Sequence, residues 1–266
     1  MMQRRIAVIS AAASGIGRAI AEALRGDGWR VYIGDADAAS IAALGPGDAS
    51  FAARVCDVRD PAAVADFYAW IASDLAVCGA EGIDLLVNNA GIAGPTARLE
   101  DQPVDGWNAT IDVNLNGAFL MTRSAIPLLR RRAPGSAIIT MSSTAGLFGC
   151  PLRGPYVATK WALIGLTKTL AMELGPEGIR ANAICPGSVE GPRIDRVIAA
   201  DAAERGLTVG EVEREYKRQT SLRTFATAED VTAMVQYLMS PAGARISGQA
   251  IAIDGHTESL ALDMEA

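Results

Sequence analysis

The sequence is poor in histidine, because His256 is the only one among its 266 residues. A chain with a single imidazole cannot build the His-rich sites that hold zinc or copper. It also leaves a Ser-His-Asp triad with one candidate base, close to the end of the chain. The sequence therefore predicts no metal site.

Cysteine and positive charge are scarce as well. The four cysteines, at 56, 78, 150 and 185, show no CxxC or other ligand spacing. A chain of this length does not need disulfides, so this usage favours a reducing, cytoplasmic compartment. The 24 basic residues against 30 acidic ones give a net charge of −6. Binders of nucleic acid or anionic membranes need a positive field, so we expect neither as a partner.

Long apolar runs suited to a membrane are also missing. Only a short, weakly apolar run follows the N-terminal residues 1–5, too little for the apolar core of a signal peptide. The longest uncharged stretch, 133–152, contains two prolines and three glycines, which argue against a membrane helix. We therefore expect a soluble protein.

What the chain does have is a regular alternation of short Val/Ile-rich runs and longer Ala/Leu-rich runs. The predicted strands are 5–9, 29–33, 51–55, 83–87, 137–141, 179–184 and 250–253, and the predicted helices are 17–24, 62–75, 105–129, 156–174 and 229–239. Strands that are apolar throughout and alternate with helices are buried on both faces, as in parallel sheets. The sequence predicts a single-domain α/β Rossmann fold over 1–266, with a doubly wound, seven-stranded parallel sheet.

One connection departs from this rhythm. Roughly 65 residues, 186–249, separate the sixth and seventh predicted strands, far more than a crossover needs. The part from 193 to 219 looks helical and highly charged. Because insertions at the carboxyl ends of parallel strands face the ligand crevice, we expect a small helical substrate lid at about 190–225.

The turn after the first predicted strand carries the first chemical signal. Small residues and glycines there, Ser14-Gly15-Ile16-Gly17, let backbone N–H groups approach a pyrophosphate. Tight packing of a strand against a helix would explain the same residues. The turn alone therefore does not decide.

Asp35 ends the second predicted strand, 18 residues after Gly17. A carboxylate there can accept both hydroxyls of an adenosine ribose, and it repels a 2′-phosphate. Neither Ser14 nor Ala36 offers a cation to hold such a phosphate. These residues favour NAD over NADP, although a helix cap is the alternative for Asp35.

Tyr156 and Lys160 are four residues apart in a predicted helix, so they share a face. A nearby ammonium lowers the pKa of a phenol, which makes a base that works near neutral pH. For the pair alone, an ordinary amphipathic helix with a half-buried tyrosine is the alternative. However, Ser143 follows the fifth predicted strand, where its hydroxyl can hold a substrate oxygen, and Asn114 lies in the long helix 105–129.

In this combination the sequence resembles the classical short-chain dehydrogenase/reductase family over essentially the whole chain. The resemblance implies a catalytic tetrad of Asn114, Ser143, Tyr156 and Lys160. It implies cofactor contacts from Ser14, Gly15, Ile16, Gly17, Asp35, Asp57, Val58, Asn89, Ala90, Gly91, Tyr156, Lys160, Pro186, Gly187 and Val189. Within this set, Ile16 would donate a backbone N–H to the pyrophosphate, Asp57 and Val58 would contact the adenine, and Val189 would contact the nicotinamide carboxamide.

Two positions depart from the family pattern. Ala11 replaces the first glycine of the Thr-Gly-x-x-x-Gly-x-Gly turn, and Ser10 replaces its threonine. The methyl of Ala11 narrows the backbone options, which bears on cofactor affinity. Gly191-Pro192 stands where the family has a threonine two residues after Val189, so a hydrogen bond to the nicotinamide is missing or supplied from elsewhere.

The resemblance implies NAD-dependent interconversion of a secondary alcohol and its ketone, with a small molecule as substrate and a homotetramer as assembly. Ser143 and Tyr156 would hold the substrate oxygen, Lys160 would tune Tyr156, and Asn114 would order a water that relays the proton. The substrate stays open among sugars, polyols and hydroxy acids. Arg153, three residues before Tyr156, would suit an anionic group on it, or else lies on solvated surface.

Two alternatives remain. An NADPH-dependent 3-oxoacyl thioester reductase predicts a basic residue near Ser14 or Ala36, which the sequence lacks. A non-catalytic nucleotide-binding scaffold would have no reason to keep Tyr156 and Lys160 at this spacing.

Overall fold

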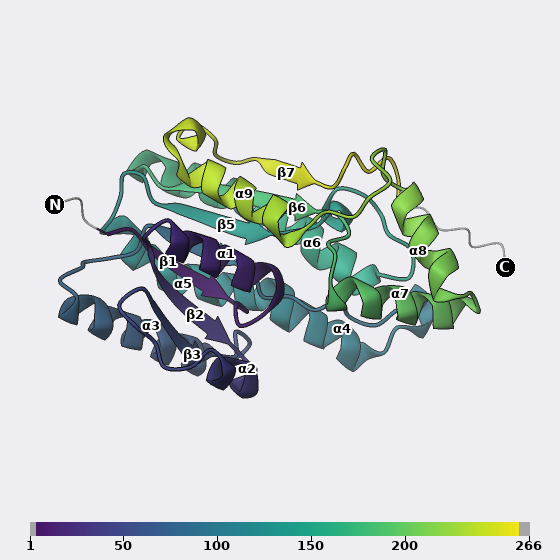
Figure 1. Cartoon of the computed structure of the whole chain (residues 1–266), viewed down its shortest axis with the longest axis horizontal. Coiled ribbons are helices and arrows are strands. Elements are labelled where there is room, and N and C mark those ends of the chain that lie inside the picture. The colour runs from purple at the N-terminus through teal and green to yellow at the C-terminus, as the bar shows by residue number, and fades with distance from the viewer. Residues whose placement is uncertain (1–3, 261–266) are drawn as a thin grey trace.

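The computed structural model describes residues 4–260 (Figure 1). Over this range seven strands form one parallel sheet in the order β3-β2-β1-β4-β5-β6-β7. They are β1 (Ile6–Ser10), β2 (Arg30–Asp35), β3 (Phe51–Val55), β4 (Leu85–Asn88), β5 (Ala137–Met141), β6 (Arg180–Pro186) and β7 (Ala250–Ile253). The chain winds outward from β1 in one direction and from β4 in the other, which confirms the doubly wound sheet. The β1–β4 boundary is the switch point where such sheets bind ligands.

Helices cover both faces of the sheet. They are α1 (Gly15–Gly26), α2 (Ala38–Ala43), α3 (Pro61–Val77), α4 (Val104–Ile111), α5 (Gly117–Arg130), α6 (Gly154–Leu174), α7 (Pro192–Arg205), α8 (Val209–Arg218) and α9 (Ala228–Met239). Figure 1 shows α1 and α9 side by side on the near face. No helix within residues 4–260 is both long and apolar enough to cross a bilayer.

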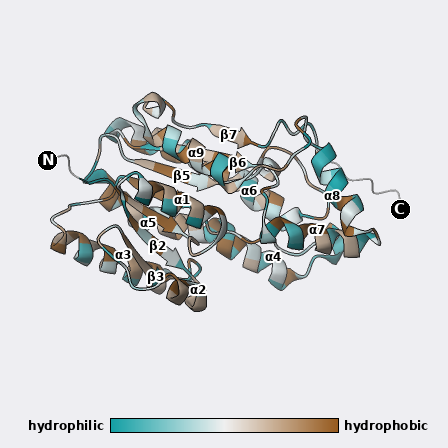
Figure 2. Cartoon of the chain, in the orientation of Figure 1, coloured by the Kyte–Doolittle hydropathy of each residue, from teal (hydrophilic) through white to brown (hydrophobic). Residues whose placement is uncertain are grey.

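Two apolar cores result from the alternation of side chains along each buried strand. On β1, Val8 packs into a core with α3, α5 and α6, whereas Ile9 packs into a second core with α1 and α9. Figure 2 shows the contrast between the apolar strands and the hydrophilic exposed surface of α8. Burial on both faces explains why the strands read as continuous apolar runs in the sequence.

The predicted strands agree with the observed ones to within two residues at each end, but three helical predictions need correction. Helix α2 was not expected. The predicted helix 105–129 contains a π-helical turn at Asp112–Asn116 between α4 and α5. The segment 193–219 is two helices, because Gly206 ends α7 in the left-handed conformation and Thr208 caps α8 in a capping box with Glu211.

Helices α7 and α8, here called the α7–α8 hairpin, lie beyond the carboxyl end of β6 (Figure 1). They pack on each other through a small apolar cluster of their own, which includes Ile194, Ile198 and Val212. A bridge between Thr220 and Thr257 ties the chain after α8 to the segment after β7. The α7–α8 hairpin is thus a small unit of the fold with its own apolar cluster, attached at the carboxyl end of the sheet, where the site lies.

Candidate active site

The turns after β1 and β4 are joined at the switch point of the sheet. The buried Ser10 hydroxyl accepts hydrogen bonds from the N–H groups of Asn89 (3.0 Å) and Ala90 (3.1 Å). The Asn89 side chain in turn donates to the backbone carbonyls of Ser10 (3.1 Å) and Ala11 (2.8 Å). Ala11 adopts a φ of 50°, the left-handed conformation that glycine takes without steric cost. The serine thus supplies the hydroxyl of the family's threonine, and the alanine is strained.

The start of α1 fits a pyrophosphate. Its first N–H groups have no acceptor within the helix, and the side chain of the N-cap residue Ser14 does not cap them. Gly15 has a φ of 57°, and a Cβ on Gly17 would lie 2.5 Å from the Asn89 Nδ2 atom and 2.6 Å from the Ala11 carbonyl oxygen. These backbone N–H donors lie at the positive end of the helix dipole, and no side chain obstructs them. Such a helix terminus can bind an anion.

Asp35 lies at the carboxyl end of β2, beside this turn. Its two carboxylate oxygens accept from the N–H groups of Ala13 (3.1 Å) and Asp37 (3.1 Å). The N-cap of α2 is Asp37, whose side chain accepts from the Ala39 N–H. Capping α2 is therefore not the role of Asp35, and the residue is partly exposed at the carboxyl end of β2.

The predicted adenine-contacting residues follow β3 at the same edge. Asp57 forms an ion pair with Arg59 at 2.6 Å, so its carboxylate is already engaged. Val58 is buried close to Gly117 of α5, where a Cβ would come within 2.6 Å of its Cγ2 atom. Gly91, after β4, brings backbone close to the tetrad, since a Cβ there would lie 3.4 Å from the Lys160 Nζ atom.

Asn114 lies in the π-helical turn and is fully buried. Its amide oxygen accepts from the Ile92 N–H (2.8 Å), and its amide nitrogen donates to the Ile92 carbonyl (3.0 Å) and the Thr159 hydroxyl (3.1 Å). Both N–H donors are thus used within the chain. The side chain fixes the turn after β4 against α6, and π turns of this kind recur at functional sites.

Lys160 lies on α6 and is almost completely buried. Its ammonium donates to the Met141 carbonyl (2.8 Å) and lies 5.4 Å from the centroid of the Tyr156 ring. Burial lowers the pKa of Lys160, and the adjacent Tyr156 partly offsets this. The helical spacing thus brings the two side chains together as expected.

The Tyr156 phenol lies among positive charges. Burial alone would raise its pKa, but Lys160, Arg193 and a hydrogen bond with Ser143 act against burial. Arg153 adds to their effect, and the pKa of Tyr156 is lowered overall. The Ser143 hydroxyl also accepts from the Ala145 N–H (3.1 Å), which fixes it at the carboxyl end of β5. The arrangement can hold an oxygen and accept a proton from it.

The segment after β6 completes the crevice. Pro186 ends β6, and Gly187 passes close to the following strand, since a Cβ there would lie 2.9 Å from the Asp254 Cβ atom. Val189 forms a bridge with Ala226. Gly191 follows with a φ of 128°, which glycine tolerates and the family's threonine would not.

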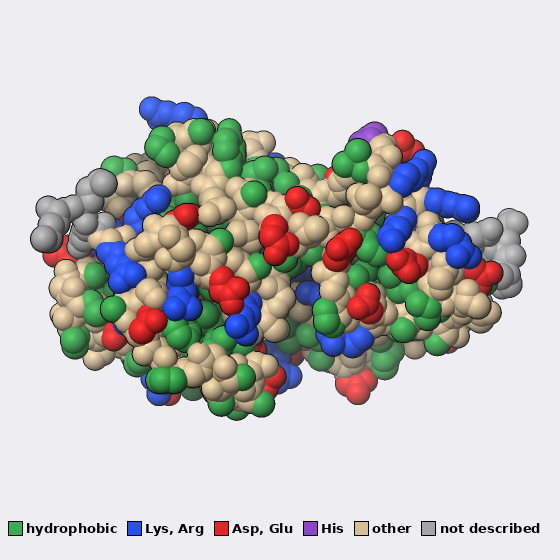
Figure 3. Space-filling view, viewed as in Figure 1, with side chains coloured by type: hydrophobic (Ala, Val, Ile, Leu, Met, Phe, Trp, Pro, Cys, Tyr) green, Lys and Arg blue, Asp and Glu red, His purple; other side chains and the backbone are tan. Residues whose placement is uncertain are grey.

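Arg153 and the arginines of the segment 190–225 occupy different surroundings. Arg153 is buried, and Arg193, although exposed, acts on both Tyr156 and Lys160. Arg196 is exposed. Arg223 lines a recess of about 540 Å³ on the α7–α8 hairpin together with Arg214, Lys217 and Arg218. Figure 3 shows basic side chains gathered at that end of the molecule.

Two residues near Arg153 were missed in the sequence. Asp201 on α7 is 1 % exposed, and its carboxylate accepts from the Tyr216 hydroxyl of α8 at 3.1 Å. The available signal was helical spacing, because Asp201 shares a face of α7 with the apolar Ile194 and Ile198. A carboxylate on an apolar face indicates a buried polar contact.

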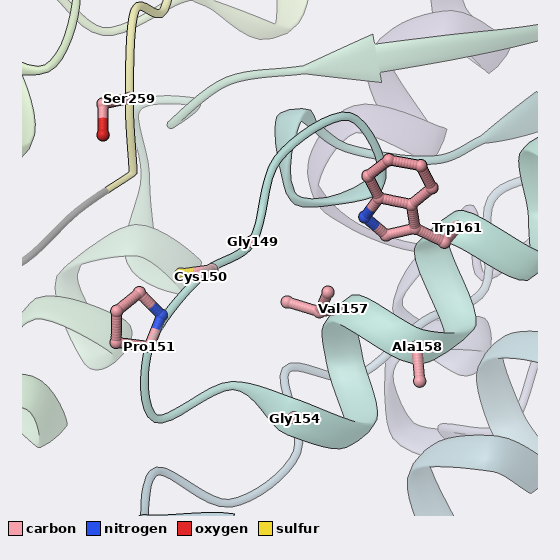
Figure 4. A pocket seen from close by; sticks show the side chains of 8 residues that line it. All are labelled: Gly149, Cys150, Pro151, Gly154, Val157, Ala158, Trp161 and Ser259. Carbon is pink, nitrogen blue, oxygen red and sulfur yellow. The ribbon is translucent and has the colours of Figure 1, made fainter.

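A recess of about 720 Å³ lies beside the site, but none of the tetrad residues lines it (Figure 4). Its lining residues are Gly149, Cys150, Pro151, Gly154, Val157, Ala158, Trp161 and Ser259. Burial raises the pKa of the Cys150 thiol to about 11, so this thiol stays protonated near neutral pH. No group of three or more potential metal-binding side chains occurs among the residues that the structure describes.

Comparison with known proteins gives concordant matches. A family model described as Enoyl-(Acyl carrier protein) reductase matches residues 11–256. A putative ketoacyl reductase of the monensin polyketide synthase from Streptomyces virginiae is 38% identical, over 94% of this chain and 96% of the relative. A D-beta-hydroxybutyrate dehydrogenase from Cupriavidus necator is 36% identical, over 96% and 98%. The solved structure of NAD⁺-bound xylitol dehydrogenase has a TM-score of 0.86 at 25% identity, over 94% and 97%.

Proposed function

The chain belongs to the classical short-chain dehydrogenase/reductase family, whose members are oxidoreductases that use nicotinamide cofactors, and we propose that it is an NAD-dependent dehydrogenase of secondary alcohols. The observation that carries this proposal is the position of the Tyr156 phenol beside Ser143 and with its ring centroid 5.4 Å from the Lys160 ammonium, surroundings that lower the pKa of the phenol. A phenol in this state is a base at pH values where a free tyrosine is not.

Each of the four tetrad residues has a separate role in the proposed oxidation. When bound, the nicotinamide dinucleotide supplies an acceptor for the carbinol hydride. Ser143 donates a hydrogen bond to the alcohol oxygen, and the Tyr156 phenolate accepts the hydroxyl proton as the carbonyl forms. Lys160 favours the phenolate electrostatically, while Asn114 holds α6 in place through Thr159.

The preference for NAD rests on Asp35. Its carboxylate lies at the edge of the pyrophosphate turn, where a 2′-phosphate would meet like charge. The similarity to an NAD⁺-bound xylitol dehydrogenase supports the same cofactor. Relatives named for a hydroxy acid and a polyol support a substrate among hydroxy acids, polyols and sugars.

Reduction of an oxoacyl thioester with NADPH is the second candidate. The polyketide ketoacyl reductase relative and the description of the matching family model favour it. Asp35 argues against it, since NADPH carries the phosphate that this carboxylate would repel.

We also propose how the chain is organised: one domain over 1–266, the α7–α8 hairpin as its substrate lid, and a homotetramer in the cytoplasm. Phe119 on α5 and the residues Trp161 and Met172 on α6 support assembly through these helices, because large apolar side chains on them are exposed.

Initial rates of NADH formation test the proposed reaction. The purified protein is assayed with NAD and with NADP against polyols, sugars and 3-hydroxy acids, with Tyr156→Phe as the blank. We expect turnover with NAD that the substitution abolishes. Preferential use of NADP with an oxoacyl thioester would instead favour the second candidate.

A further inference from the structure

We propose that the substrate carries a carboxylate and that Arg153 binds it, between Tyr156 and the α7–α8 hairpin. This assignment rests on the proposed dehydrogenase function and narrows its substrate class to hydroxy carboxylates.

The first observation is the burial of Arg153. Only 6 % of the residue is exposed, and its Nη2 atom is buried without a hydrogen-bond partner. In the described part of the chain its guanidinium forms no ion pair. Burying a cation without a partner is strongly unfavourable. A ligand that places an anion beside the Arg153 guanidinium would offset this cost and would therefore bind more tightly.

The second observation is that the backbone fixes where Arg153 lies. The preceding residue, Leu152, is in the left-handed conformation with a φ of 63°. Its carbonyl accepts from the Ala97 N–H (3.2 Å) and the Gln102 side chain (3.4 Å). Strained, tied backbone of this kind is typical of loops that position a functional side chain.

The third observation is that Arg153, the N-cap residue of α6, carries a charge that acts on two elements of the site. Arg153 acts electrostatically on the Tyr156 phenol of α6 and on the Tyr216 phenol of α8. A carboxylate bound to it would therefore lie under the α7–α8 hairpin, with the rest of a short substrate directed towards Tyr156 and Ser143.

Asp201 of α7 is a buried acidic residue whose charge acts on the same Tyr216 phenol as that of Arg153, and only one of its oxygens is engaged. The Asp201 carboxylate accepts from Tyr216, and one of its oxygens lies 3.9 Å from an Arg205 nitrogen. Asp201 makes no ion pair with Arg153, although its other oxygen is also unpartnered. The charges that act most strongly on Tyr156 are instead three cations, Lys160, Arg193 and Arg153. The charges around Tyr156 are thus positive, and a carboxylate on the substrate would complement them.

Binding of carboxylate and amide pairs tests the assignment without requiring turnover. Butyrate and cyclohexanecarboxylate, with their neutral amides, are titrated calorimetrically into the NADH-loaded protein. We expect the carboxylates to bind about 10- to 100-fold more tightly than the amides, as for a charged hydrogen-bonded pair. Arg153→Met removes this difference and leaves the amides within about threefold, whereas Arg153→Lys keeps part of it.

The matched control is Arg196→Met, which removes an exposed arginine from α7 and should change no affinity. Melting temperatures of the variants show whether each is folded, and Arg153→Lys keeps the test valid if Arg153→Met is not. Equal binding of carboxylates and amides to the parent protein overturns the assignment. So does an equal loss for both classes in Arg153→Met, which would mean that Arg153 only supports packing against the hairpin.

Turnover of 3-hydroxybutyrate, 4-hydroxycyclohexanecarboxylate and their amides separates this assignment from the proposed function. If carboxylates bind through Arg153 and no alcohol is oxidised with either cofactor, the proposed reaction fails and the carboxylate site stands. If polyols are oxidised equally by the parent protein and Arg153→Met, without any preference for carboxylates, the reaction stands and the carboxylate site fails.

Discussion

Ala11→Gly tests the strain in the cofactor turn. Ala11 is held at a φ of 50° because its N–H donates to the Gly34 carbonyl (2.6 Å) and its own carbonyl accepts from Asn89 (2.8 Å). A left-handed conformation costs an L-residue about 1–2 kcal/mol, which glycine avoids. Glycine loses about 0.5–1 kcal/mol more backbone entropy on folding, so the substitution should raise the free energy of unfolding by up to about 1.5 kcal/mol.

The neighbouring Ala12 provides the matched control. It is fully buried and has no positive φ, so Ala12→Gly loses a buried methyl, worth about 0.8 kcal/mol, in addition to the same entropy. We expect Ala12→Gly to lower the free energy of unfolding by about 1–2 kcal/mol. The free energies of unfolding of the two glycine variants should therefore differ by more than about 1 kcal/mol, with Ala11→Gly the more stable of the two.

Urea denaturation followed by circular dichroism measures both variants, and titration with NADH measures the cofactor site. Ala11→Gly should bind NADH at least as tightly as the parent protein, because its turn no longer opposes the required backbone. Equal destabilisation by the two substitutions would refute the reasoning, since it would mean that the left-handed alanine costs nothing.

Three further results are expected. Asp35→Ala should lower kcat/KM with NAD about tenfold and narrow the preference over NADP, because it removes a charged hydrogen-bond acceptor and the repulsion of the 2′-phosphate. The oxidation rate should rise with pH and level off above the pKa of Tyr156, which lies below the ordinary value of 10.0; Lys160→Met should move this inflection to higher pH. Arg132→Met should destabilise by about 1–3 kcal/mol in urea denaturation, because the largely buried Asp84 carboxylate loses its ion-pair partner at 3.0 Å and keeps the Ile6 N–H as a donor. A pH profile unchanged by Lys160→Met, a cofactor preference unchanged by Asp35→Ala, or an unfolding free energy unchanged by Arg132→Met would each contradict its argument.

Much of the fold could be predicted because each strand is buried on both faces and is therefore apolar throughout. Strands 51–55, 137–141 and 250–253 were predicted to the residue. Helix α2 was missed because none of its six residues is buried, so it has no apolar periodicity. The π turn within 105–129 was missed because neither propensity nor periodicity distinguishes it from an α-helix.

The site was predictable where its chemistry depends on spacing along one element. Tyr156 and Lys160 share a helix, and the structure brings them together. The role of Asn114 was less accessible, because its partners Ile92 and Thr159 are distant in the sequence. With both amide N–H groups in use, its side chain positions α6 and the turn after β4, and its predicted role in ordering a water stays a prediction.

The electrostatics of the site show most clearly what composition cannot predict. A net charge of −6 argues against a broadly positive surface, which is why neither nucleic acid nor an anionic membrane was expected as a partner. The net charge does not predict the charge of the reaction centre. Exposed charges are screened within about 10 Å at moderate salt, and charges act strongly only where they are buried together. Lys160 of α6 and Arg153 at its N-cap are buried and act on Tyr156, and the exposed Arg193 of α7 adds to their effect. A protein with a negative net charge can therefore present a cationic site to an acidic substrate. The sequence alone does not predict this, because it does not show that Arg153 is buried.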